Sequence, residues 1–307
     1  MTVLLTRSDI LRALHVPAVL DALRAGFRQS NDIEPLRIRT DLPGPGTATA
    51  LLPGLIPGIP AYTVKVNAKF PDASPALRGV VCLHDLTDGT LLALLDSATI
   101  TAWRTGLAAA LATDALAGPA TSVGVVGAGA QTAMVIAGLA VLRKIEQLVV
   151  YDLDPERAAE FLVQQGIPGT VANSPQEVAA AADIVVLATW SRRPLLTAAD
   201  VRPGQHFTTL GADEPGKVEL SADLLSAARV VVDDRALAAQ MGALGNVGLP
   251  ADAAHATFSE VLTGAAAGRR SAGELTVYAP VGLPWQDLAI AWPVHQAAEG
   301  KTIDFLV

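Results

Sequence analysis

The spacing of apolar positions changes near residue 120 of the chain. Before that point, apolar residues recur at helical spacing over residues 10–27, where Pro17 interrupts the pattern, and over residues 100–116. Short apolar runs typical of strands lie between these helices, at residues 63–66, 80–83 and 91–95. The Thr-, Gly- and Pro-rich stretch 37–55 predicts short strands and turns. The first part of the chain is therefore expected to mix helices and strands.

From residue 120 onward, β-rich runs alternate with helical segments. The strands are expected at residues 122–126, 147–151, 184–188, 206–210 and 229–232. One helix is expected over residues 130–142. Two more should begin at Asp154, an acid cap before proline, and at Ser174, which has capping-box spacing to Glu177. Apolar strands separated by helices are typical of a parallel sheet covered on both faces.

The predicted fold class is α/β, with two domains. Residues 116–274 should form a Rossmann-type, doubly wound parallel sheet. The tail is mixed again, with a strand-like run at 274–278 and a helical run at 285–298. We therefore expect residues 275–307 to return and form a mixed α+β domain with residues 1–115.

Composition excludes several classes of protein. Hydrophobic residues make up 51% of the 307 residues and charged residues 17%, which predicts folded cores. The net charge of −8 argues against nucleic-acid partners and anionic membranes. The uncharged stretch 123–142 is as long as a membrane helix, but it contains glycines and splits into a strand pattern and a helix pattern. We therefore expect no membrane span.

Cysteine and histidine content limits the chemistry further. Cys82 is the single cysteine, so no disulfide framework and no all-thiolate zinc site can form. The five histidines show no metal-ligand spacing, and residues 1–24 lack the apolar core of a secretory signal. A cytoplasmic protein without a metal site is the expectation.

The central motif is Gly127-Ala128-Gly129-Ala130-Gln131, which follows a predicted strand and opens a predicted helix. In a dinucleotide site the first glycine permits a tight turn, the second lets the backbone approach a pyrophosphate, and the helix N-terminus offers free N–H groups. The third glycine of the full fingerprint would fall at Thr132, so the match is incomplete. A glycine turn without a nucleotide is the alternative.

Asp152 follows the second predicted strand, 25 residues after Gly127. An acid at this place accepts hydrogen bonds from the ribose 2′-hydroxyl and repels a 2′-phosphate. Because no arginine follows immediately, the sequence favours NAD(H) over NADP(H). A solvated acid at the end of the strand is the alternative for Asp152.

With these motifs in place, the chain resembles the ornithine cyclodeaminase/mu-crystallin family. Besides the glycine motif, the matching segments occur in the family's order from about residue 35 to 290: Arg104-Thr105-Gly106, Gly211-Ala212-Asp213-Glu214-Pro215-Gly216-Lys217, Gly268-Arg269-Arg270-Ser271, Thr276-Val277-Tyr278, Val281-Gly282 and Gln286-Asp287. The resemblance implies hydride exchange between a nicotinamide and the α-carbon of an amino or imino acid. It also implies a homodimer built through the non-nucleotide domain, which would bind the substrate.

Three cations are candidates for binding anionic groups. Arginine's planar fork suits a carboxylate. The resemblance implies that Arg39 and Lys65 bind the substrate carboxylate and that Arg104 lies against the cofactor phosphates. We also expect Lys65 to be a catalytic residue. Arg37 is a rival of Arg39, Lys69 is a rival of Lys65, and a solvated surface charge is the alternative in each case.

Asp213 is the candidate acid/base group. It follows a predicted strand at its carboxyl end, where open α/β sheets place their ligands, and a carboxylate there could move a proton at a substrate nitrogen. The same rule makes Thr189 a cofactor-side hydroxyl. The resemblance assigns proton transfer to Asp213, cofactor contacts to Gly211 and Lys217, and substrate binding to Val281. A turn or helix-cap aspartate is the alternative for Asp213.

The chain departs from the cyclodeaminases at one informative position. Their glutamate, which handles the distal amine of ornithine, corresponds to Ala50, and Glu34 lies too far upstream to replace it. Ala76 and Pro280 stand where the family has hydroxyl residues, with Ser74 near the first. Cyclisation requires the distal amine to be held and deprotonated for its attack on the imine carbon. Because Ala50 has no carboxylate to do this, the sequence favours a reductase or dehydrogenase over a cyclodeaminase.

We therefore expect an NAD-dependent imine reductase or amino-acid dehydrogenase acting on a small L-amino or imino acid. An ornithine cyclodeaminase with bound NAD is one alternative. A non-catalytic, mu-crystallin-like binding protein is another, although a binder has no need of a proton carrier such as Asp213.

Overall fold

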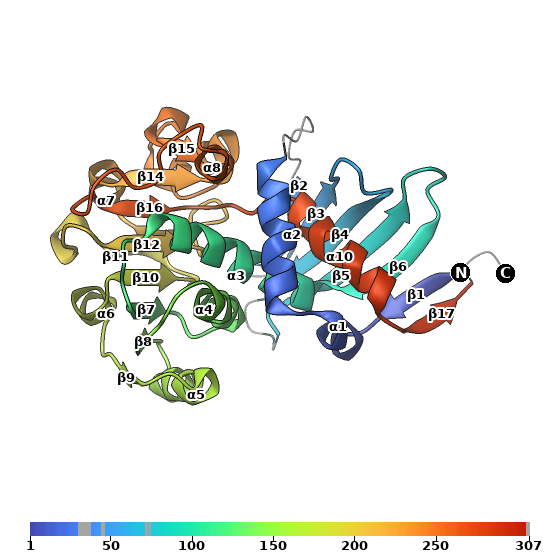
Figure 1. Cartoon of the computed structure of the whole chain (residues 1–307), viewed down its shortest axis with the longest axis horizontal. Helices are drawn as coiled ribbons and strands as arrows, with labels where there is room; N and C mark the ends of the chain where they lie inside the picture. Colours follow the sequence, from blue (N-terminus) through green and yellow to red (C-terminus); the bar gives the residue numbers. More distant parts are fainter. Residues whose placement is uncertain (30–37, 44–46, 71–72, 74, 305–307) are drawn as a thin grey trace. The chain divides into compact units, whose positions relative to one another are not determined.

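A computed structural model describes residues 1–29, 38–43, 47–70, 73 and 75–304 (Figure 1). The chain divides into two compact units: Met1–Arg104 with Leu283–Val307, and Thr105–Gly282. The first division falls within helix α3 (Ser97–Leu116), not after it, and the second follows residue 282. The sequence placed these boundaries after residues 115 and 274.

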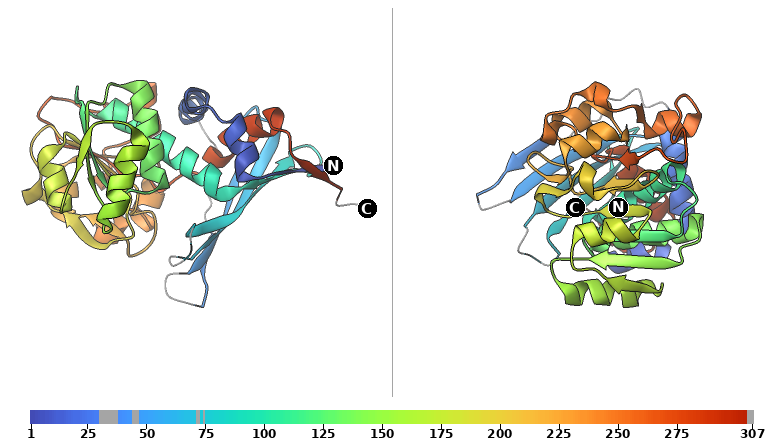
Figure 2. Two further views of the ribbon diagram at one scale, coloured as in Figure 1. Left: turned by 90° about the horizontal axis from the view of Figure 1, so that it is seen from below. Right: turned by 90° about the vertical axis from the view of Figure 1, so that its left-hand side faces the viewer.

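The first unit contains a seven-stranded mixed sheet. Its order is β17 (Lys301–Ile303), β1 (Thr2–Leu5), β6 (Leu91–Asp96), β5 (Leu77–Asp85), β4 (Ala61–Lys69), β3 (Ala48–Gly54) and β2 (Ile38–Asp41). Neighbouring strands run antiparallel except β1 and β6, which are parallel. Helices α1 (Arg7–Ala13), α2 (Val16–Arg28) and α10 (Trp285–Ala297) lie together on one face of this sheet (Figure 2). Helix α10 packs against β3, β4 and β5, so the end of the chain completes the core begun by the first strands.

The predicted helix over residues 10–27 is two helices in the structure. Helix α1 ends at Ala13, and Pro17 lies in the first turn of α2. Proline has no N–H to donate and suits a first turn, whereas in a helix interior it breaks a hydrogen bond. The proline thus begins the second helix instead of interrupting one long helix.

The second unit contains an eight-stranded sheet in which every neighbouring pair is parallel. Its order is β15 (Ala256–Thr257), β14 (Arg229–Val232), β16 (Thr276–Tyr278), β12 (His206–Thr209), β10 (Ile184–Leu187), β7 (Ser122–Val126), β8 (Gln147–Tyr151) and β9 (Gly169–Val171). The remaining helices are α4 (Ala130–Leu142), α5 (Pro155–Gln165), α6 (Pro175–Ala181), α7 (Ala222–Ala227), α8 (Arg235–Gln240) and α9 (Phe258–Thr263). A separate strand pair joins β11 (Arg192–Leu196) and β13 (Val218–Leu220). Helices flank both faces of the large sheet, which confirms the Rossmann-like α/β fold class (Figures 1 and 2).

The central strands of the parallel sheet are buried as their sequences predict, whereas the edge strand β9 is exposed. All four residues of β10 and of β14 are buried, and β7, α4 and β8 have the predicted bounds. The uncharged stretch 123–142 is divided between β7 and α4. Within the ranges described above, no helix has both the length and the apolar character that crossing a bilayer requires.

Candidate active site

The glycine loop between β7 and α4 has the geometry of a phosphate cradle. Gly127 has φ 97°, and a Cβ on it would lie 2.6 Å from the Ala188 carbonyl oxygen, so only glycine fits there. Gly129 caps α4, and a Cβ on it would meet no atom within 4 Å. Ala130 and Gln131 form the first turn of α4. The open face over Gly129 at a helix N-terminus fits the pyrophosphate of a dinucleotide.

Thr132 occupies the place of the missing third glycine. It is fully buried, and its hydroxyl accepts a hydrogen bond from the Gly129 N–H at 3.0 Å and lies 2.8 Å from the Gly127 carbonyl oxygen. The threonine hydroxyl thus links Gly127 and Gly129, the two ends of the loop, by hydrogen bonds. The incomplete fingerprint therefore still forms the turn.

Asp152 lies beside the glycine loop. Its Oδ2 accepts from the Ala128 N–H at 2.8 Å and its Oδ1 accepts from the Asp154 N–H at 3.1 Å. Each oxygen retains a further lone pair, so the carboxylate could still accept a ribose hydroxyl. Asp154 caps α5 and adds a second negative charge close by.

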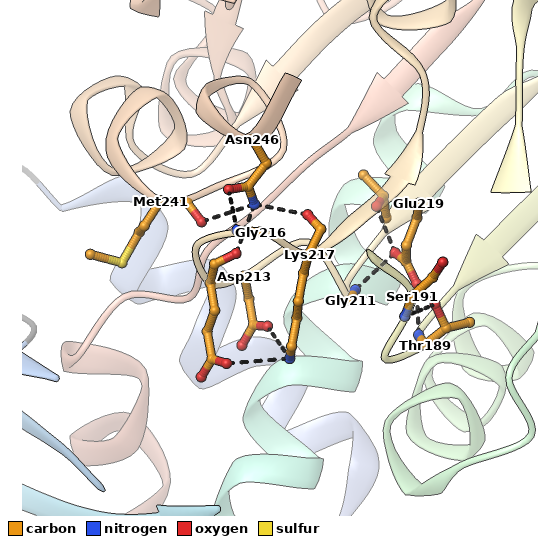
Figure 3. Close-up of polar contacts among 11 residues, drawn as sticks. Thr189, Ser191, Gly211, Asp213, Gly216, Lys217, Glu219, Met241 and Asn246 are labelled. Atoms are coloured by element: carbon orange, nitrogen blue, oxygen red, sulfur yellow. Dashed lines mark hydrogen bonds and ion pairs between the residues drawn. The ribbon is translucent and has the colours of Figure 1, made fainter. Parts of the chain in front are cut away.

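Thr189 and Gly211 are joined by a buried carboxylate that the sequence did not indicate (Figure 3). Glu219 on β13 accepts from the Thr189 N–H at 2.6 Å and from its hydroxyl at 2.8 Å through Oε1. Through Oε2 it accepts from the Thr209 hydroxyl at 2.6 Å and the Gly211 N–H at 2.8 Å. It thereby ties the loop after β10 to the loop after β12.

The electrostatics of Glu219 reflect its burial. Desolvation raises the pKa of this carboxyl, and its four hydrogen-bond donors oppose the rise. A charged residue inside the short apolar run Val218–Leu220 was the one signal that could have identified it.

Asp213 and Lys217 lie in the loop after β12 and form an ion pair, with Lys217 Nζ 3.0 Å from Asp213 Oδ1 (Figure 3). Glu214 Oε2 is 3.6 Å from the same nitrogen, and the Trp190 ring centroid is 4.2 Å away. Burial lowers the pKa of Lys217, but the negative charges of Asp213 and Glu214 outweigh it and raise that pKa. The Asp213 side chain is 24% exposed, so the group assigned to proton transfer is accessible.

Asn246 fixes the shape of this loop. Its Nδ2 donates to the Glu214 carbonyl oxygen at 2.7 Å and the Lys217 carbonyl oxygen at 2.8 Å, and its Oδ1 accepts from the Gly216 N–H at 3.0 Å (Figure 3). It lies about thirty positions downstream in a short 3-10 helix, and no local pattern marked it. The conformation of the Asp213 loop is thus fixed by a side chain that does not belong to the loop.

These groups meet at one edge of the parallel sheet. The glycine loop, Asp152, Thr189 and Asp213 follow β7, β8, β10 and β12 in turn, and these four strands are adjacent in the order β12-β10-β7-β8. Because the strands are parallel, their carboxyl ends share an edge. The second unit alone brings together all but one of the predicted cofactor residues.

The remaining cofactor candidate, Arg104, lies in the first unit in a buried charged cluster with Lys65. Asp287 of α10 lies between them: Lys65 Nζ is 2.7 Å and 2.9 Å from its two oxygens, and Arg104 Nε is 3.4 Å from Oδ1. Arg104 also donates to Gln286 Oε1 at 3.1 Å. Lys65 is 1% exposed, so it is not a solvated surface lysine, and its rival Lys69 lies at the end of the same strand.

Arg39 lies on β2, directly opposite Ala50 of β3. Its guanidinium pairs with Asp41, with Nη2 2.6 Å from Oδ1. The rival Arg37, together with Glu34 and Ser74, lies outside the described residues. Ala50, which stands at the position of the cyclodeaminase glutamate, is buried. Because it is an alanine, it provides no carboxylate there.

Val281 is held by a second buried carboxylate. Asp233 accepts from the Val281 N–H at 3.0 Å and from the Gly282 N–H at 2.6 Å. Desolvation raises the pKa of Asp233, and these backbone donors oppose the rise. The hydrogen bonds fix the turn in which Gly282 takes φ 97°.

The described histidines do not form a metal-binding arrangement. Over the part of the chain that the structure covers, no three His, Cys, Asp or Glu side chains are arranged to bind a metal. His206 lies in the core between the hydroxyls of Thr208 and Thr276, each at 2.9 Å, and burial lowers its pKa to about 3. It is a neutral core residue at physiological pH.

Known proteins resemble the chain over most of its length. It is 34% identical over 239 residues to an alanine dehydrogenase of Archaeoglobus fulgidus, covering 75% of this chain and 73% of that protein. The solved Delta(1)-pyrroline-2-carboxylate reductase of Thermococcus litoralis, in complex with NADH and L-proline, superposes with a TM-score of 0.93 at 25% identity, over 98% of this chain and 100% of the other. An archaeal alanine dehydrogenase dimer with bound NAD superposes with a TM-score of 0.90 at 26% identity, over 99% of each chain.

The family model agrees with the motifs and with the fold. The model of the ornithine cyclodeaminase/mu-crystallin family matches residues 1–302, which is nearly the whole chain. The chain belongs to the ornithine cyclodeaminase/mu-crystallin family.

Proposed function

We propose that this protein is an NAD-dependent oxidoreductase that exchanges a hydride with the α-carbon of a small L-amino or imino acid, as an imine reductase or an amino-acid dehydrogenase. The observation that carries the proposal is the edge of the parallel sheet, where a glycine cradle, Asp152 and the Asp213–Lys217 pair follow adjacent strands. The similarity to an alanine dehydrogenase and a pyrroline-2-carboxylate reductase supports it.

The residues present fit a nicotinamide dinucleotide. The open face at Gly129 and the helix behind it would receive the pyrophosphate, and Asp152 would accept the ribose hydroxyls. Gly211, Thr189 and Lys217 are proposed to line the cofactor site. Because Asp152 and Asp154 would repel a 2′-phosphate, we propose NAD(H) and not NADP(H).

The proposed chemistry divides between two kinds of side chain. When bound, the reduced nicotinamide supplies a hydride to the imine carbon. Lys65 and Arg39 are proposed to bind the substrate carboxylate, Val281 to contact the substrate, and Arg104 to bind the cofactor phosphates. Asp213 is proposed to donate the proton that the imine nitrogen takes up, and Lys217 stabilises the carboxylate that remains.

The test is a set of incubations with defined substrates. Purified protein with NADH is given Delta(1)-pyrroline-2-carboxylate, or pyruvate with ammonia, and the absorbance of the reduced cofactor is followed. Net oxidation of NADH supports the proposal. Ornithine converted to proline and ammonia without net cofactor change would establish a cyclodeaminase instead, although Ala50 leaves no carboxylate at that position of the sheet. Tight NADH binding without any turnover would indicate a binding protein.

We further propose that the protein is a homodimer. The face of the mixed sheet opposite α10 presents a row of apolar side chains across β2, β3 and β4: Ile38 pairs with Leu51, and Leu51 with Val66. These three are 51%, 41% and 37% exposed in the single chain. An exposed apolar row on a sheet is typical of an interface. The archaeal alanine dehydrogenase that this chain resembles is a dimer.

A further inference from the structure

Among the described residues, one buried carboxylate in the first unit, that of Asp287, contacts two basic side chains, Lys65 and Arg104. Asp287 lies in the first turn of α10 and is fully buried. Both of its oxygens are within 3 Å of Lys65 Nζ, and Oδ1 is also 3.4 Å from Arg104 Nε. A single carboxylate therefore serves two cations that come from different elements, β4 and α3.

The surroundings of Lys65 make this carboxylate important. On the neighbouring strands, Lys65 is in register with Leu52 of β3 and Val81 of β5, neither of which carries a charge. From the packed helix α10, Asp287 pairs with Lys65, and the same carboxylate contacts Arg104 of α3. A buried ammonium is costly unless it is paired, and Asp287 provides that pairing within hydrogen-bond distance.

The two cations have different proposed tasks. Under the proposed function, Lys65 binds the substrate carboxylate and Arg104 the cofactor phosphates. Arg104 has a second partner, because its Nη1 donates to Gln286 Oε1 at 3.1 Å. Asp287 is thus the shared counter-charge between the substrate-binding and the cofactor-binding cation.

We propose that Asp287 is a positioning residue for the reaction, which holds Lys65 charged and in place for the substrate carboxylate while leaving Arg104 available for the cofactor. This inference rests on the proposed function, because it assigns Lys65 to the substrate. It adds a residue that would act on substrate binding through its ion pair with Lys65.

The two cations should respond differently when Asp287 is removed. Removing a negative charge beside a buried lysine lowers the pKa of that lysine, so Lys65 in the variant would lose its proton at a lower pH than in the wild type. A guanidinium stays charged in proteins. Loss of the carboxylate should therefore weaken substrate binding in a pH-dependent way and leave cofactor binding nearly unchanged.

The experiment compares Asp287→Asn, the charge-preserving Asp287→Glu and the control Asp114→Asn. Asp114 pairs with Arg143 at 2.8 Å and does not contact the cluster. For Asp287→Asn we expect a KM for the imino acid that rises by up to about tenfold per pH unit on the alkaline side, while the Kd of NADH changes by less than about threefold. Asp287→Glu should restore the flat profile at least in part, and Asp114→Asn should keep it.

A second readout does not depend on activity. A lysine whose pKa is lower in the folded than in the unfolded protein costs stability below its unfolded pKa, and the cost fades as pH rises toward that value. The urea midpoint of Asp287→Asn should therefore lie below that of the wild type at neutral pH and approach it at alkaline pH. Adding Lys65→Met removes the buried charge and should restore the midpoint, which also covers the case in which Asp287→Asn alone does not fold.

The outcomes separate this inference from the proposed function. A KM for Asp287→Asn that stays flat with pH, or NADH affinity that falls as much as substrate affinity, would overturn the positioning role. A urea deficit that is constant with pH would show that Asp287 acts in packing alone. A wild-type protein without turnover on any imino acid would overturn the proposed function, whereas the urea series would still decide whether Asp287 keeps Lys65 charged.

Discussion

At the scale of single residues, Asp213 is the group on which the proposed chemistry depends. It is part-exposed and paired with Lys217, and Asn246 fixes the backbone that carries it. The carboxylate is therefore both fixed in position and accessible from outside the protein. Its neighbours Lys217 and Asn246 hold it in place.

Replacing Asp213 with asparagine should therefore affect turnover far more than cofactor binding. We expect kcat to fall by about 10²- to 10⁴-fold, because an amide cannot transfer the proton. The Kd of NADH, measured by fluorescence titration, should stay within about threefold, since the glycine loop and Asp152 are untouched. Turnover close to wild type would remove Asp213 from the mechanism.

Asp152 should govern the choice between NADH and NADPH. Asp152→Ser keeps a hydrogen-bonding group near Ala128 but removes the charge that would repel a 2′-phosphate. We expect the preference for NADH, as the ratio of kcat/KM values, to fall by about tenfold or more. The matched control is Asp223→Asn, which removes an exposed carboxylate from the first turn of α7 and should leave the ratio unchanged. An unchanged ratio in Asp152→Ser would count against the assignment.

At the scale of elements, the parallel sheet shows what sequence patterns can predict. Strands β7, β8 and β14 were predicted with their observed bounds, because buried parallel strands are continuous apolar runs. The edge strand β17 was missed because it is short and exposed, with too few apolar positions to form a pattern. Strand β13 was missed because it is three residues long and contains a charged residue.

The same limit applies to the candidate site. Motif residues such as Gly127 and Asp213 stand next to recognisable strands, so their placement followed from the sequence. Glu219, Asn246 and Asp287 act on residues that are distant in the chain or in another element, and their partners are known only after folding. Sequence motifs indicated the residues that we propose to contact ligands, and of the three supporting residues only Asp287 lay in a matched motif, without any sign of its partners.

Replacing Glu219 tests whether the residues that support the site are needed for cofactor binding. It accepts four hydrogen bonds, from Thr189 after β10, from Thr209 at the end of β12 and from Gly211 after β12. Glu219→Gln would place an NH₂ group against two of those donors. We expect a loss of about 1–3 kcal/mol in the free energy of unfolding, by urea titration, and weaker NADH binding by about tenfold. Glu177→Gln, in an exposed α6 cap, is the control and should leave NADH affinity unchanged. Unaltered NADH affinity in Glu219→Gln would show that the two loops hold their shape independently.

At the scale of the whole molecule, the mixed sheet has one face covered by helices and one face with an apolar row. Leu51 stands in the middle of that row, between its register partners Ile38 and Val66. In a homodimer this face would be withdrawn from water, whereas in a monomer the row would remain hydrated at a cost in free energy. The proposed assembly thus follows from the surface of the first unit.

Leu51→Lys should therefore dissociate the dimer. A charge buried in a two-fold interface meets its own copy or the same apolar surface, so we expect the sedimentation coefficient to change from that of a dimer toward that of a monomer. Leu153→Lys is the matched control, because Leu153 is 91% exposed in the other unit. A wild-type protein that sediments as a monomer would refute the dimer directly.

The first unit is built from both ends of the chain, and this affects the order in which the protein can fold during synthesis. Helix α10, which carries Asp287 and fills the core over β3 to β5, is translated only after the whole of Thr105–Gly282. Domains generally fold as units while the nascent chain emerges. The parallel-sheet unit can therefore fold on the ribosome first, whereas β4 is synthesised early and its Lys65 can pair with Asp287 only after the last segment has been made.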